Sequence, residues 1–76
     1  MPRGALNWNY KEVVSVLKDH GFTLRHIEGS HHYFIATVNG IMRQVCIPFH
    51  GKKTFRPRTL NSMIRQSGLT KKEWGF

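Results

Sequence analysis

Two adjacent histidines, His31 and His32, stand in the stretch EGSHHYF (residues 28–34), directly after a glycine and a serine. Histidine is the side chain whose ordinary pKa lies near neutral pH, so it can serve as a general base or acid without help. A group of this kind can move the proton of a ribose 2′-hydroxyl, which then attacks its own phosphate. RNA cleavage by that route needs no metal, but it needs cations that stabilise the crowded phosphate.

Suitable cations cluster further along the chain, in residues 52–58: Lys52, Lys53, Arg56 and Arg58. Gly29 lets the backbone approach a substrate closely, and the Ser30 hydroxyl can hydrogen-bond a phosphate oxygen. The same two residues are equally suited to a plain turn between strands. Both interpretations of Gly29-Ser30 stay open on the sequence alone.

Other chemistries find less support. The carboxylates are scattered and form no pair for two-metal catalysis or glycoside hydrolysis: Glu12, Asp19, Glu28 and Glu73. The histidines lack the close spacing of a strong metal site: His20, His26, His31, His32 and His50. We therefore expect neither a metal nor a cofactor.

Charge is the strongest feature of the composition. The 76 residues include 12 Lys and Arg against 4 Asp and Glu, for a net charge of +8. A polyanion such as a nucleic acid is the natural partner of such a chain. The alternative is a solvated basic surface that only keeps a small protein in solution.

Chain length and cysteine content indicate the number of domains and the cellular compartment. A chain of this length is expected to form one domain, residues 1–76, and to be a monomer when free. No apolar run is long enough to span a bilayer, and the start of the chain carries no apolar segment of signal-peptide type. Cys46 is the only cysteine, which fits a reducing compartment. We expect a cytoplasmic protein with no membrane association.

The elements that position the histidines follow from local patterns. Residues 9–21 read as a helix capped by Asn9 and ended by Gly21, and residues 57–68 as a second helix that begins at Pro57. Between them the hydrophobic period changes to two, which predicts three antiparallel strands: residues 22–28, 31–38 and 41–48. Residues 70–74 add one helical turn. The expected fold is α+β, with order α-β-β-β-α and two helices packed on one face of a three-stranded antiparallel sheet.

The turn Asn39-Gly40 separates the roles of the histidines. A two-residue hairpin at this point pairs Val38 with Ile41 and fixes the register of both strands. His32 then faces the helices, where a hydrogen-bonded structural role is favoured. His31 lies on the open face, where a substrate can reach it. Arg43 falls on the helix side, and we expect it to reach solvent near the hairpin end.

Several aromatic residues lie outside the expected sheet and helices, where they can stack on unpaired bases or pack over helix ends: Trp8, Phe49, Phe55, Trp74 and Phe76. Packing is the favoured interpretation for each of them. Cys46 shares the open face with Tyr33, and inert packing is expected there too.

The chain resembles the HicA-type (YcfA-like) mRNA interferase toxins. The resemblance covers residues 10 to about 70 and rests on four stretches in the family's order: HGF, EGSHHYF, VCIPFHG and RPRTLNSMIRQSGL. The start of this chain is longer than is typical. Arg58 stands where the family often has glycine.

The resemblance implies a fold similar to the double-stranded-RNA-binding domain. It also implies a toxin that cleaves mRNA and stops translation until a HicB-like antitoxin covers the His31 site. The histidine that follows glycine-serine in the family is catalytic, and it corresponds to His31. The alternative is a non-catalytic RNA-binding module of similar fold, which binds through Lys52, Lys53, Arg56 and Arg58.

Overall fold

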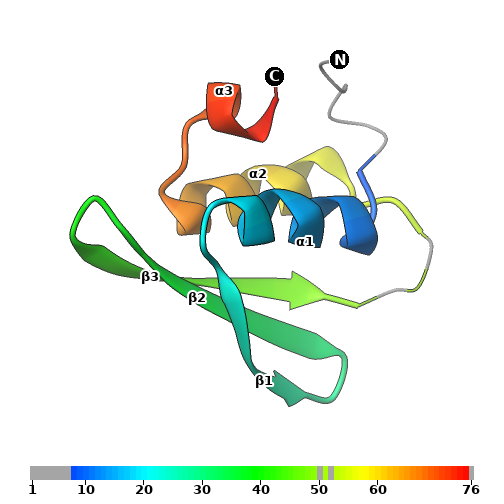
Figure 1. The fold of residues 1–76 in the computed structure, drawn as a ribbon. Coiled ribbons are helices and arrows are strands. Elements are labelled where there is room, and N and C mark those ends of the chain that lie inside the picture. The colour runs from blue at the N-terminus through cyan, green and yellow to red at the C-terminus, as the bar shows by residue number, and fades with distance from the viewer. Residues whose placement is uncertain (1–7, 50, 52, 76) are drawn as a thin grey trace.

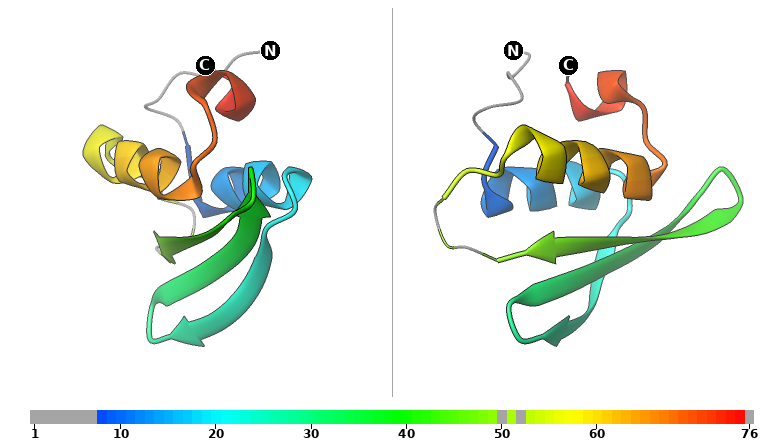
Figure 2. Two further views of the ribbon diagram at one scale, coloured as in Figure 1. Left: turned by 90° about the vertical axis from the view of Figure 1, so that its left-hand side faces the viewer. Right: turned by 180° about the vertical axis from the view of Figure 1, so that it is seen from behind.

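A computed structural model describes residues 8–49, 51 and 53–75. Its elements are, in chain order, α1 (Tyr10–Asp19), β1 (Thr23–Glu28), β2 (His31–Val38), β3 (Ile41–Pro48), α2 (Pro57–Ser67) and α3 (Lys71–Trp74). The strands form one antiparallel sheet in the order β1-β2-β3. Helices α1 and α2 lie side by side on one face of that sheet, and α3 lies on their far side (Figures 1 and 2). The α+β fold expected from the sequence is confirmed.

The helices begin and end at the residues that the sequence singles out. Asn9 and Glu12 form a reciprocal capping box, in which each side chain accepts the other residue's backbone N–H at 3.0 Å. Gly21, just past the end of α1, has a φ of +87°, a conformation that favours glycine. Pro57 opens α2, and Gly68 ends it with a φ of +72°.

The register of the sheet agrees with the hairpin prediction. Asn39 and Gly40 have φ values of +52° and +79°, as a type I′ turn requires, and Val38 pairs with Ile41. His31 therefore stands opposite Pro48, and His32 stands opposite Ile47. An irregularity that the sequence did not predict interrupts the pairing of β1 with β2 between Leu24 and His26.

One hydrophobic cluster joins the sheet to the helices. Its buried members are Trp8, Val13, Leu17, Phe22, Phe34, Val45, Ile47, Phe55, Leu60, Met63, Ile64, Leu69 and Trp74. Packing is thus confirmed as the role of Trp8, Phe55 and Trp74, while Phe76 lies outside the described residues. Strand β1 contributes nothing to this cluster, because all six of its residues are exposed.

Arg43 lies on the helix side of the sheet, as expected, and reaches solvent only in part. Its side chain is half-buried and runs against Gly68 at the end of α2. The Nε atom is buried without a hydrogen-bond partner. The arginine therefore packs against the end of α2.

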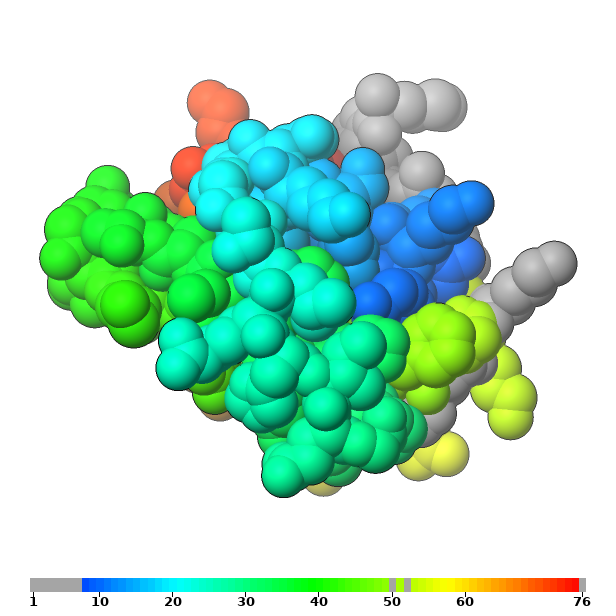
Figure 3. Space-filling model, turned by 60° about the horizontal axis from the view of Figure 1, so that its bottom comes forward, coloured from blue at the N-terminus to red at the C-terminus, as the bar shows by residue number. Residues whose placement is uncertain are grey.

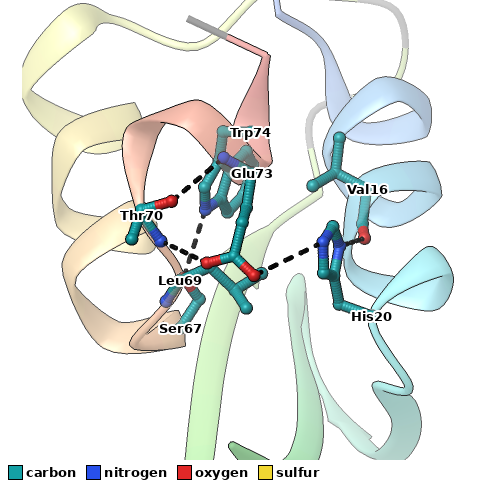
Figure 4. Close-up of polar contacts among 7 residues, drawn as sticks. All are labelled: Val16, His20, Ser67, Leu69, Thr70, Glu73 and Trp74. Carbon is teal, nitrogen blue, oxygen red and sulfur yellow. Dashed lines mark hydrogen bonds and ion pairs between the residues drawn. The ribbon is translucent and has the colours of Figure 1, made fainter.

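Helix α3 is fastened to the rest of the fold by polar contacts (Figure 4). Thr70 and Glu73 form the capping box that the sequence predicts, with bonds of 2.9 and 3.1 Å. The buried Ser67 Oγ accepts the indole N–H of Trp74 at 3.2 Å. Glu73 Oε2 also lies 3.8 Å from Nε2 of His20, which connects α3 to the end of α1.

Candidate functional site: a basic groove beside His31

The turn between β1 and β2 presents His31. Gly29 has a φ of +61° whereas Ser30 stays out of the left-handed region, which is the pattern of a two-residue type II′ turn. The carbonyl of Ser30 accepts the backbone N–H of Phe49 at 2.7 Å. The turn is therefore joined to the chain just past β3, and His31 starts β2 beside that junction.

The two adjacent histidines face opposite sides of the sheet. His32 is half-buried on the helix side, where its Nδ1 lies 2.6 Å from the hydroxyl of Tyr10 and its ring stacks on Phe49. His31 is exposed on the other face. Figure 3 shows the molecule from that side, with β1 and the β1–β2 turn at the front and no helix covering them. The structural role expected for His32 is confirmed.

His31 lines a hollow of about 340 Å³ between the end of β3 and helix α2. The other lining residues are Cys46, Pro48, Arg58, Thr59, Ser62, Met63 and Gln66. Arg58 is exposed there, so an imidazole and a guanidinium border the same space.

A second hollow, of about 450 Å³, continues the first, because Pro48 and Thr59 line both. Its cations are Lys53 and Arg56, and both are exposed. We call the two hollows together the basic groove. Lys52 and His50 lie outside the described residues.

Gln66, which the sequence did not single out, fixes one wall of the basic groove. Its Oε1 accepts the backbone N–H of Cys46 at 3.0 Å, and its Nε2 lies 3.4 Å from Oγ of Ser62. The outer edge of β3 is thus bonded to α2 at this point. Ser62 and Gln66 are four residues apart and share one helix face, but only the docking of α2 brings that face to the strand.

The open face next to His31 carries polar side chains from all three strands. Tyr33 stands between His26 and Cys46, and its ring stacks on His26 at a centroid distance of 4.5 Å. A hydrogen bond with Cys46 raises the pKa of the Tyr33 hydroxyl, and electrostatic repulsion from Cys46 adds to that effect. The phenol therefore stays neutral at physiological pH. Glu28 stands directly opposite His31 on β1.

Within the described parts of the chain, no three His, Cys, Asp or Glu side chains come together as a potential metal site. Those parts also contain no helix that is long and apolar enough to cross a membrane. The polar residues that line the basic groove include a histidine, cations and hydroxyl-bearing residues.

Comparison with known protein families shows which family the chain belongs to. The model of the HicA toxin of bacterial toxin-antitoxin systems matches residues 10–69. The chain belongs to the HicA toxin family. A comparison with curated proteins gives no match. The HicA match includes His31 and the residues of the basic groove, whereas α3 and Trp8 lie outside it.

Proposed function

We propose that this HicA family member is the toxin of a toxin–antitoxin pair and an endoribonuclease that cleaves mRNA and thereby stops translation. The observation that carries the proposal is the meeting of His31 and Arg58 at one hollow. Lys53 and Arg56 stand in the adjoining hollow. A proton-transfer group next to a row of cations is what cleavage of a phosphodiester requires.

In the proposed reaction His31 removes the proton of a ribose 2′-hydroxyl, or donates a proton to the leaving oxygen. The 2′-oxygen forms a bond to the adjacent phosphorus, and the bond from phosphorus to the 5′-oxygen breaks. The products are a cyclic phosphate and a 5′-hydroxyl. The nucleophile belongs to the substrate, so the proposed reaction proceeds without a metal or other cofactor.

The phosphate is held by the groups around the histidine in this proposal. Arg58, Lys53 and Arg56 supply positive charge from the described part of the groove. Lys52, which we also propose as an RNA-binding residue, lies outside the described residues. The Ser30 hydroxyl and the backbone at Gly29 approach the phosphate from the β1–β2 turn. Contacts of this kind hold the backbone of any RNA sequence.

The proposed partner is an acidic, HicB-like antitoxin. The basic groove is open and shallow, so a protein that covers His31 and the cations excludes RNA from the site directly. Opposite charge speeds the capture of a free, monomeric toxin in the cytoplasm, and salt slows that capture. RNA bound beforehand is expected to slow it as well.

The test compares wild type with His31→Ala, and it uses His26→Ala as a matched control for an exposed histidine on the same sheet face. Each variant is expressed without antitoxin, and each purified protein is incubated with RNA in the presence of EDTA. We expect growth arrest and cleavage from wild type and His26→Ala, and neither from His31→Ala.

Cleavage by a folded His31→Ala protein would remove this residue from the mechanism. Cleavage that EDTA abolishes would contradict the metal-independent route. Salt-dependent binding by wild type that leaves RNA intact after long incubation would favour the non-catalytic RNA-binding module.

A further inference from the structure

Phe49 is an exposed aromatic ring that its neighbours hold in place. The residue is 44% exposed. The ring lies nearly parallel to that of His32, at 7° and 5.2 Å between centroids, and nearly perpendicular to that of Tyr10, at 87° and 4.9 Å. Its backbone N–H is bonded to Ser30. Little conformational freedom remains to be lost when a flat ligand lies against Phe49.

This ring forms one wall of a third hollow, of about 610 Å³, at the start of α1. Asn9, Tyr10, Lys11 and Gly51 complete the lining. Lys11 is exposed and brings a positive charge to the rim. An aromatic surface combined with a cation is the arrangement that binds an unpaired base together with its phosphate.

Phe49 lies next to residues that flank His31, although the third hollow shares no lining residue with the basic groove. Phe49 directly follows Pro48, which pairs with His31, and it is bonded to Ser30, which directly precedes His31. Consecutive Cα atoms lie about 3.8 Å apart, so the platform is about one residue away from the strand position opposite the histidine. Phe49 and His31 thus lie at the same end of β3 but face opposite sides of the sheet.

We propose that Phe49 is a stacking platform for an unpaired nucleobase of the RNA substrate, and that Lys11 binds a phosphate beside it. The inference rests on the proposed function for the identity of the ligand, and it adds a base-binding subsite on the helix side of the sheet. Stacking accepts every base, so the subsite anchors single-stranded RNA and excludes paired bases.

The experiment measures binding of the full-length protein to short single-stranded 2′-O-methyl RNA, which lacks the attacking hydroxyl and stays intact. The variants are Phe49→Ala, Phe49→Leu and Phe49→Trp. Met42→Ala is the matched control, because Met42 is a 70% exposed apolar residue near the far turn of the β2–β3 hairpin. Thermal unfolding of each variant confirms that it is folded.

We expect Phe49→Ala and Phe49→Leu to weaken binding by about 5- to 150-fold, the range that corresponds to removal of the stacking of one base on an aromatic ring. Phe49→Trp should bind as wild type or more tightly, and Met42→Ala should bind as wild type. A fluorescent 2-aminopurine in the oligonucleotide should be quenched by wild type and not by Phe49→Leu.

Unchanged affinity in both Phe49→Ala and Phe49→Leu would overturn the inference. So would absence of RNA binding by wild type, or variants that keep RNA affinity and lose only capture by an antitoxin. The proposed nuclease function is tested separately, by measuring cleavage of ordinary RNA. Phe49-dependent binding without any cleavage would overturn the nuclease activity and leave the stacking subsite standing.

Discussion

The hydroxyl of Tyr10 lies 2.6 Å from Nδ1 of His32, and this contact joins the first turn of α1 to the helix side of β2. Burial raises the pKa of Tyr10, so the phenol keeps its proton across the physiological range. The adjacent His31 makes no side-chain hydrogen bond within the described residues. His32 therefore joins α1 to β2, whereas the side chain of His31 remains exposed.

Replacing Tyr10 with phenylalanine should lower stability. The variant loses one net hydrogen bond, which contributes about 1 kcal/mol, and Tm should fall by roughly 4–8 °C. Thermal unfolding followed by circular dichroism measures the change. A Tyr10→Phe protein as stable as wild type would show that the contact contributes nothing to folding.

Ser67→Ala should lower stability more than Tyr10→Phe does, because the Ser67 hydroxyl is buried and forms hydrogen bonds with three partners. Oγ donates to the carbonyl of Ile64 at 2.6 Å and accepts N–H groups from Leu69 and Trp74. Its removal leaves two donors unsatisfied, which should lower the free energy of unfolding by about 2–4 kcal/mol. Denaturant unfolding measures the loss, and the exposed Ser15→Ala is the control. Equal losses in the two variants would refute this account.

Glu73 should make the stability of the α3 attachment depend on pH. Hydrogen bonding to the backbone of Thr70 lowers the pKa of this carboxyl below its ordinary 4.5, and the Thr70 side chain and His20 act in the same direction. Because the folded-state pKa is the lower one, the stabilisation is complete above pH 4.5 and is lost as pH falls through the folded value.

The corresponding variant is Glu73→Gln, which does not titrate and can still accept the Thr70 N–H. Tm measured between about pH 3 and 7 should fall less steeply on the acidic side for this variant than for wild type. Parallel profiles would show that Glu73 does not contribute to the acid sensitivity.

Arg58→Ala should weaken RNA binding and reduce its dependence on salt. Each phosphate of single-stranded RNA that is no longer neutralised by a cation lowers the slope of log K against log salt by about 0.7. Affinity measured between about 50 and 200 mM salt gives that slope. Lys18→Ala is the control, since Lys18 lies in the last turn of α1, away from the basic groove. Equal slopes for Arg58→Ala and wild type would place the phosphate elsewhere.

The sequence by itself determined the elements and the opposite orientation of the two histidines. Capping boxes, a proline at the start of a helix and an Asn-Gly turn act over a few residues, so their effect does not depend on the rest of the fold. Once Asn39-Gly40 fixes the register, the alternation of side chains along β2 places His31 and His32 on different faces. That conclusion required no knowledge of how the helices pack.

Only the tertiary structure decided what surrounds His31. The position of α2 along β3 brings Arg58 to the hollow that His31 lines. It also brings Gln66 to the backbone of Cys46, across 20 residues of sequence. The same packing buries part of Arg43 against Gly68, where the sequence suggested an exposed end. Contacts of this kind depend on how two elements that are distant in the sequence pack together. Local sequence patterns do not predict that packing.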